Sequence, residues 1–228
     1  MVIQKVRAND SFIEELLNGW ISANQRYVEL LNRTDCCWWY NERTNVSVLA
    51  GAAWSLGWTA IEEYPSDKKI KGYTGENPDS NTSKGRVDLY IKNELESIAL
   101  EAKHVWHNLD KNINKDICYI GSARRDTECL RNQADRHFAA TFIVFYTKES
   151  LNEFILEERI TTTINHAIRK TNNEAISYAY LIDNKSAFMN DRKEYYQSVA
   201  VILEHIHHIS PGIKPQSSNN TPGDGLTG

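Results

Sequence analysis

Apolar residues recur with helical spacing over the first quarter of the chain. Ser11 and Glu14 stand three residues apart at the start of one apolar stripe, which is the pattern of a capping box. We therefore predict an N-terminal helix over residues 10–33. A second stripe with the same period predicts a helix from about residue 41 to residue 56, and Gly57 follows it as a stop signal.

After Gly57 the pattern changes to the alternation typical of β-strands. Strands are predicted at Trp58–Tyr64, Arg86–Ile91 and Ser97–Lys103. Residues 65–83, between the first two strands, are rich in Lys, Gly, Asn, Asp and Ser and predict a long loop or hairpin. Asn93 and Glu94 mark a short turn, so the second and third strands are expected to form a hairpin.

Helices and strands are also predicted in the rest of the chain. Residues 109–137 are polar, with sparse apolar positions, and predict two helical pieces interrupted near Gly121 and Ser122. The further elements are a strand at Ala140–Tyr146, a helix at Leu151–Arg169, a strand at Ala175–Ile182, and a strand or short helix at Tyr195–Ile206. This order predicts an α/β fold with a mixed central β-sheet flanked by helices.

Length and composition fit one domain followed by a tail. The chain has 228 residues, of which 41% are hydrophobic, and we predict a single domain over residues 1–209. Residues 210–228 are rich in Pro, Ser, Asn and Gly and are expected to be disordered. With 26 Lys and Arg against 30 Asp and Glu, the net charge of −4 excludes a surface that is basic all over, so any nucleic-acid contact must be local.

Targeting signals and cysteine spacing favour a cytoplasmic protein. The chain begins without the apolar stretch of a signal peptide, and no run approaches the ~18 apolar residues of a transmembrane helix, so no membrane association is expected. The four cysteines lack Cys-x-x-Cys spacing. We interpret them as buried thiols rather than as disulfides or a zinc site.

Asp88, Glu101 and Lys103 are the residues that point to chemistry. Strand periodicity places Glu101 and Lys103 on one face, and pairing about the turn at Asn93 brings Asp88 near Glu101. Two adjacent carboxylates repel each other unless a cation lies between them. Hard oxygen ligands favour Mg²⁺, with Mn²⁺ as a substitute. Lys103 would then orient or deprotonate an attacking water, or hold the charge of a phosphate.

A solvated pair of charges on neighbouring strands is the competing interpretation. Such pairs contribute only a few tenths of a kcal/mol and are common. However, the strand from Ile98 to Ala102 is apolar apart from Glu101, and an acidic group in a buried strand is costly unless it has a role. We therefore favour the metal site.

The same residues resemble the core motif of the PD-(D/E)xK nucleases, which share the restriction-endonuclease-like fold. The motif is Asp88, then twelve residues, then Glu101-Ala102-Lys103, and the resemblance covers roughly residues 41–146. It implies that Asp88, Glu101 and the carbonyl of Ala102 bind magnesium, and that Lys103 serves the attacking water. Val87 stands where the family often has its proline.

The resemblance also implies a function and two supporting residues. It implies a Mg²⁺-dependent nuclease that hydrolyses DNA, with RNA as a further substrate to consider, in restriction, phage defence or repair. A homodimer would let such a small enzyme cut both strands. Glu42 matches an acidic helix residue of the family, although a favourable charge in the first turn of a helix is an equal account. Gln133 matches a helix glutamine only in part. A catalytically inactive nucleic-acid-binding or scaffold subunit with the same fold is the alternative.

Basic and aromatic residues near the motif are candidates for nucleic-acid contact. Lys84 and Arg86 lie beside the Asp88 strand, and Arg124 and Arg125 follow in the next helical region; local basic patches bind phosphates, but solvated faces look the same. The aromatic run Trp38-Trp39-Tyr40 offers rings that could stack on bases, although burial in the core or a dimer contact is the safer interpretation.

Overall fold

A mixed β-sheet with helices on both faces organises the protein. The computed structural model describes residues 2–70, 82–111, 117–131, 134–171, 175–185 and 188–206. Their elements are β1 (Val2–Arg7), α1 (Ser11–Leu30), the short 3₁₀ helix η1 (Cys37–Trp39), α2 (Glu42–Ser55), β2 (Thr59–Lys69), β3 (Thr82–Lys92), β4 (Ser97–Asn108), α3 (Ile117–Thr127), β5 (Arg136–Thr147), α4 (Glu153–Thr171), β6 (Ile176–Asp183) and β7 (Tyr195–Ile206). In these residues the sheet has seven strands in the order β1-β6-β7-β5-β4-β3-β2.

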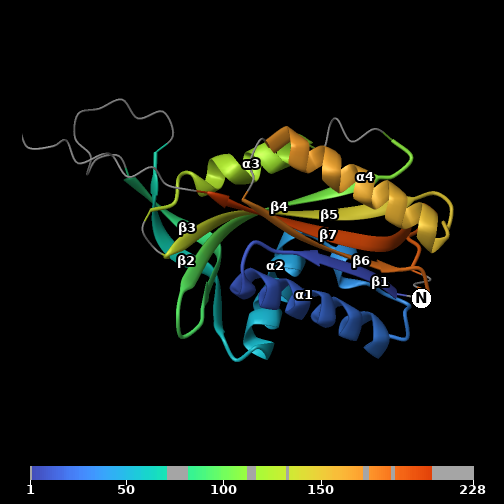
Figure 1. The fold of residues 1–228 in the computed structure, drawn as a ribbon, viewed down its shortest axis with the longest axis horizontal. Helices are drawn as coiled ribbons and strands as arrows, with labels where there is room; N and C mark the ends of the chain where they lie inside the picture. The colour runs from blue at the N-terminus through green and yellow to red at the C-terminus, as the bar shows by residue number, and fades with distance from the viewer. Residues whose placement is uncertain are drawn as a thin grey trace, which may run out of the picture.

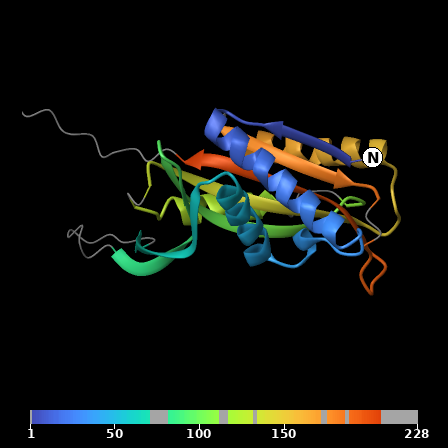
Figure 2. The ribbon, with the colours of Figure 1, turned by 90° about the horizontal axis from the view of Figure 1, so that it is seen from below.

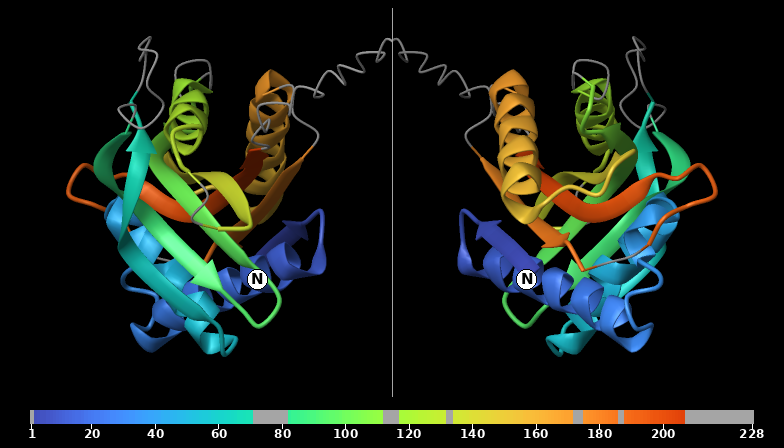
Figure 3. Two further views of the ribbon diagram at one scale, coloured as in Figure 1. Left: turned by 90° about the vertical axis from the view of Figure 1, so that its left-hand side faces the viewer. Right: turned by 90° about the vertical axis from the view of Figure 1, so that its right-hand side faces the viewer.

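The helices form one layer on each side of the sheet. α1 and α2 lie below the sheet in the view of Figure 1, and α3 and α4 lie above it. Figure 2, seen from below, shows α1 and α2 in front of the sheet, and the end views of Figure 3 show the sheet twisting between the two layers. Because both faces are covered, β5 and β7 are buried along most of their length, which explains their nearly continuous apolar sequence.

Two hydrophobic cores fill the spaces between sheet and helices. The α1–α2 side contains Trp20, Leu49, Leu100 and Phe142, all with no exposed surface. The α4 side is built around Ile160 and around the β5, β6 and β7 residues that point the opposite way. The fold thus derives its stability from apolar burial on both faces of a shared sheet.

The predicted α/β class and mixed sheet are confirmed. The sequence allowed either a strand or a short helix at Tyr195–Ile206, and the structure has the strand β7 there, with the same bounds. Residues 65–69 extend β2 rather than starting a loop. β2 and β3 pair as far as Lys69 and Thr82, so the hairpin interpretation is confirmed; residues 71–81 between them lie outside the described ranges.

The structure differs from the sequence predictions at α1, β1 and α3. α1 is capped by Asp10, whose Oδ1 accepts from the Ile13 N–H at 2.9 Å, and not by Ser11. A strand, β1, precedes α1, although no strand was predicted there. Of the two helical pieces expected in residues 109–137, only α3 is found in the described part, and it runs through Gly121 without a break because a single glycine weakens a helix but does not end it.

The prediction of buried cysteines is confirmed for two residues, and the predicted tail lies outside the described residues. Cys36 and Cys37 are buried thiols, as predicted, while Cys129 is partly exposed. The predicted tail falls in residues 207–228, which lie outside the described ranges. Within those ranges, no helix combines the length and apolar character needed to cross a membrane.

Candidate functional site at the fork between β3 and β4

The sheet forks where β3 and β4 stop pairing. Their antiparallel ladder runs from Lys92 and Ser97 to Leu89 and Leu100. Beyond that point β3 stays with β2, and β4 stays with β5. Asp88 and Glu101 are the next residues in register, so both stand at the opening of the fork, as the hairpin prediction requires.

Acidic side chains accept hydrogen bonds from backbone N–H groups of β4 that have no strand partner beyond the fork. The Ala102 N–H donates to Asp88 Oδ2 at 2.7 Å. The His104 N–H, two residues along the same edge of β4, donates to the carboxylate of Glu42 at the start of α2. A strand edge that loses its neighbour must satisfy its amides in another way. Here that need brings Asp88 and Glu42 near each other along the edge of β4.

Glu101 is a buried carboxylate with an ammonium partner. Its residue is only 4% exposed, and its Oε1 accepts from Lys68 Nζ at 2.7 Å. Burial, and then the negative charge of Asp88, raise the pKa of Glu101 to about 7, although Lys68 and Lys103 oppose the shift. The two lysines therefore offset the burial of Glu101 and the charge of Asp88 only in part.

Lys68 reaches Glu101 from β2 by passing over Gly85 of β3. A Cβ atom at position 85 would lie 3.0 Å from Lys68 Cδ and 3.2 Å from its Cγ, closer than unstrained carbon atoms approach. The absence of a side chain at Gly85 thus leaves room for the Lys68 chain. This close approach gives a structural reason for glycine at that position.

Lys103 lies beside the same group of carboxylates. Its Nζ donates to the carbonyl oxygen of Ala102 at 2.9 Å and lies 2.9 Å from Asp126 Oδ2 of α3. Burial lowers the pKa of Lys103, but the hydrogen bond and charge of Asp126, together with Glu42 and Asp88, outweigh burial and raise it. Lys103 is therefore a charged donor held at the site, with its ammonium fixed by two oxygens.

The donor set suits a small hard cation. Asp88 and Glu101 supply carboxylates, and Ala102 supplies a carbonyl. In the described residues, no group of three His, Cys, Asp or Glu side chains is arranged to hold a metal. Mg²⁺ commonly uses one or two protein carboxylates and completes its shell with water. In this structure Lys68 already supplies one positive charge to Glu101, so such an ion would have to compete with it.

A cleft of about 310 Å³ gives solvent access to Asp88. Glu42, Arg43, Glu62 and Glu63 line it together with Asn41, Val46 and Asp88. Glu63, opposite Asp88 in the β2–β3 register, adopts a φ of 54°, which is strained for a residue with a side chain. Arg43 and Arg86 both pair with the Glu63 carboxylate, at 2.7 and 3.3 Å.

The residues predicted to contact nucleic acid have different environments. Lys84 and Arg125 are exposed, and Arg86 is exposed but paired with Glu63. Arg124 instead points into the protein, where its guanidinium pairs with the buried Glu204 and donates to the carbonyl of Thr171. Gln133 lies outside the described residues.

Sequence patterns did not identify two members of the cluster as site residues. Lys68 falls in the segment predicted as a long loop or hairpin because the strand was expected to end at Tyr64, and Asp126 lies in a charged helix whose apolar positions are few. β2 extends as far as Lys69, and predicting that extension would have put Lys68 beside the motif. No local signal indicates that Asp126 pairs with a lysine of β4.

The fold and this cluster define a mixed-sheet α/β protein with carboxylates and lysines gathered at a strand fork. No protein-family model, curated protein or solved structure matches the chain.

Proposed function

We propose that the protein is a Mg²⁺-dependent nuclease of the PD-(D/E)xK type that hydrolyses phosphodiester bonds in DNA. The observation that carries the proposal is the buried Glu101 at the opening of the fork, facing Asp88, with the Lys103 ammonium fixed beside it. Burying two like charges together is unfavourable, and such arrangements are found where function requires them.

Each residue of the fork has a role in this proposal. Asp88, Glu101 and the Ala102 carbonyl hold the ion, which would supply positive charge to the scissile phosphate and lower the pKa of an attacking water. Lys103 orients the water and stabilises the negative charge that develops on the phosphate oxygens. Glu42, fixed by the His104 N–H, is placed to hold a water or support a second ion.

Exposed cations near the fork support nucleic acid as the substrate. Lys84 lies on β3 and Arg125 on α3, the two elements that also supply Asp88 and Asp126. Phosphate contacts of this kind position a backbone without reading its sequence. Restriction, phage defence and repair all require such an activity, and a homodimer would bring two sites to the two strands of a duplex.

The internal pairing of the cluster favours a second candidate, an inactive scaffold of the same fold. Lys68 pairs with Glu101, Lys103 pairs with Asp126, and Asp88 accepts a backbone N–H. A site retained only for structure would use its charged groups in this way. Titration calorimetry with MgCl₂ separates the two candidates, since the nuclease binds the ion and the scaffold does not.

A cleavage assay tests the proposal. Circular and linear DNA are incubated with the parent and with Asp88→Asn, with and without MgCl₂. Asparagine retains an oxygen acceptor for the Ala102 N–H, so the variant is expected to fold, while loss of one ligand charge should lower Mg²⁺-dependent cleavage by about 100-fold or more. Lys103→Ala should show a comparable loss.

Glu62→Gln is the matched control for this assay. Glu62 lines the same cleft, but its carboxylate accepts from Ser47 Oγ at 2.9 Å rather than standing at the fork. Its substitution should leave the cleavage rate within about twofold of the parent. If Asp88→Asn cleaves DNA as fast as Glu62→Gln does, the assignment of the fork as the catalytic site is wrong.

A further inference from the structure

A second pocket lies beyond the fork, along β4. Its cavity of about 600 Å³ is within the range of roughly 300–1,000 Å³ that is usual for small-molecule sites. Aromatic rings dominate its walls, and they come from four parts of the fold: Trp39 of η1, Trp106 of β4, Tyr146 of β5, and Phe188 and Tyr196 from before and within β7. We call these five residues and their cavity the aromatic pocket.

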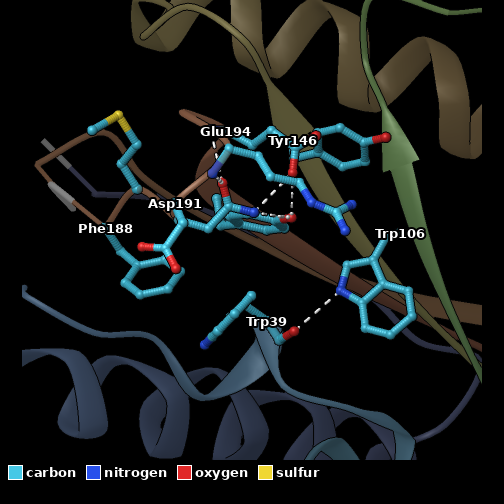
Figure 4. Close-up of a pocket in the computed structure, with 10 residues that line it drawn as sticks. Trp39, Trp106, Tyr146, Phe188, Asp191 and Glu194 are labelled. Carbon is cyan, nitrogen blue, oxygen red and sulfur yellow. Dashed lines mark hydrogen bonds between the residues drawn. The ribbon is translucent and has the colours of Figure 1, made fainter.

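Figure 4 shows how the rings surround this space. Trp106 forms one side, Tyr146 another and Phe188 the opposite wall, with Trp39 between Phe188 and Trp106. Trp39 lies 5.0 Å from Phe188 and 5.6 Å from Tyr196 between ring centroids, and Tyr146 stacks on Tyr196. The walls therefore support one another as a continuous aromatic surface.

The most exposed tryptophan of the pocket is fixed in place. Trp106 is 46% exposed, yet its Nε1 donates to the carbonyl oxygen of Trp39 at 3.1 Å, and its ring meets His104 edge-on at 4.3 Å. A large aromatic side chain held rigidly at the surface is a ready stacking platform, since little rotamer entropy is lost when a flat ligand binds.

Carboxylates stand at one side of the rings. Glu194 Oε2 accepts from Asn190 Nδ2 at 2.8 Å and from the Tyr196 hydroxyl at 3.1 Å, which fixes the carboxylate in the pocket. Asp191 adds a second negative charge. A purely apolar ligand would leave these acceptors desolvated, and a free anion would be repelled. A flat ring that carries N–H donors matches both the rings and the carboxylates.

The aromatic pocket adjoins the fork through two chain segments. Trp106 follows Lys103 by three residues of β4, or about 10 Å along the strand, and Trp39 precedes Glu42 by three residues. Trp106 and Lys103 lie an odd number of residues apart, so their side chains lie on opposite faces of β4. Beyond the fork this edge of β4 no longer pairs with β3, so a strand whose phosphate lies at the fork can pass over the edge and place a nearby base in the pocket. Arg192 also lines the pocket and adds a positive charge there.

From this geometry we infer that the aromatic pocket binds an unpaired nucleobase with an exocyclic amino group, from the same strand whose phosphate lies at the fork. A base inside a duplex is stacked on both faces and paired along one edge and cannot enter, so the substrate offers a single-stranded segment or an extruded base. The inference rests on the proposed nuclease function, and it narrows the substrate from DNA in general to DNA with unpaired bases.

Binding of short oligonucleotides without metal tests the inference separately from cleavage. Fluorescence anisotropy is measured with labelled dC8 and dT8 in EDTA, because cytosine carries the amino group and thymine lacks it. The parent should bind dC8 severalfold more tightly than dT8. Trp106→Ala should weaken dC8 binding about tenfold or more, as loss of one stacked base predicts, and Trp106→Phe should restore most of it.

Two control variants separate the pocket from the rest of the surface. Trp54 of α2 is 57% exposed and lies outside the pocket, so Trp54→Ala should bind dC8 as the parent does. Glu194→Gln should reduce the preference for dC8 over dT8 while retaining the stacking walls. Equal losses in Trp106→Ala and Trp54→Ala, or no loss in either, would overturn the inference.

The remaining results of the binding and cleavage assays also test the inference that the aromatic pocket binds a base. If the parent cleaves DNA but fails to bind dC8, the nuclease proposal stands and the pocket inference is wrong. If the parent binds dC8 through Trp106 but Mg²⁺-dependent cleavage is absent, the pocket stands and the nuclease proposal fails. Binding of tetramethylammonium that requires Trp106, with no oligonucleotide binding, would show a site for an organic cation instead.

Discussion

At the scale of single residues, Lys68 supplies one positive charge where the proposed ion would supply two. Its ammonium contacts Glu101, and its aliphatic chain passes over Gly85, where a side chain would crowd it. A divalent ion that uses the same carboxylate must therefore compete with this ammonium. The ion pair would hold the metal-free fork together and weaken its affinity for the metal at the same time.

Replacing Lys68 with methionine should strengthen Mg²⁺ binding. Lys68→Met keeps the aliphatic chain but removes the competing charge, and we expect the dissociation constant to fall about tenfold, or ~1.4 kcal/mol. Because Lys68 lowers the pKa of Glu101, its removal raises that pKa above about 7, and calorimetric titration with MgCl₂ is therefore performed at pH 9, where Glu101 is ionised in the parent and more nearly so in the variant than at neutral pH. Lys84→Met, an exposed lysine of the adjacent strand, should bind Mg²⁺ as the parent does. Unchanged or weaker binding by Lys68→Met would show that Lys68 does not compete with the ion.

At the scale of elements, α3 carries two adjacent arginines with different surroundings. Arg124 pairs with Glu204 of β7, whose side chain is 1% exposed, and so ties α3 to the sheet. Arg125 is exposed on the same helix. From the sequence, both arginines were interpreted as phosphate contacts, because two adjacent arginines do not reveal which side chain points inward.

Substituting each arginine with alanine should separate stability from binding. Arg124→Ala removes a cation that pairs with the buried Glu204 and should lower the free energy of unfolding by about 3 kcal/mol, the lower end for a broken buried pair because Arg124 is partly exposed. Arg125→Ala should change it by less than ~0.5 kcal/mol but weaken DNA binding. Urea denaturation and DNA titration measure the two effects. Equal stability of the two variants would contradict the assignment.

The strands of the motif were predictable because alternation and turn chemistry are local. Val87, Leu89 and Ile91 are all buried, and the Asn93 turn sets the register that brings Asp88 to Glu101, as predicted. Contacts between distant elements were not predictable. The Lys68–Glu101 pair spans 33 residues and depends on how far β2 extends, which no local pattern in residues 65–69 indicates.

Two further segments whose predictions were wrong or missing show the same limit. Residues 136 and 137 were included in a helical piece, but they begin β5, where Arg136 lies opposite Ile98 of β4. Pairing with a neighbouring strand overrides a weak helical tendency in a polar segment with few apolar positions. β1 was missed for a related reason, since six residues that are at most partly buried and show no regular alternation become a strand only when β6 is beside them.

At the scale of the whole molecule, the fork lies within a sheet that both hydrophobic cores share. Leu100 packs in the α1–α2 core, and Val105 of the same strand packs in the α4 core. β4 therefore cannot unfold while either core stays intact. An ion bound at Glu101 and Asp88 would require this strand to be in place, so its binding should be coupled to global unfolding rather than to a local opening.

This coupling predicts that Mg²⁺ stabilises the protein as a unit. At a free ion concentration of about 100 times the dissociation constant, the free energy of unfolding should rise by ~2.7 kcal/mol. For a chain of this size that is a rise in Tm of roughly 5–10 °C, measured by calorimetry with MgCl₂ and with EDTA. Asp88→Asn and Glu101→Gln should lose most of the rise, while Glu62→Gln should keep it. A full rise in Asp88→Asn would place the stabilising ion elsewhere, because the fork would then lack one of its two carboxylate ligands.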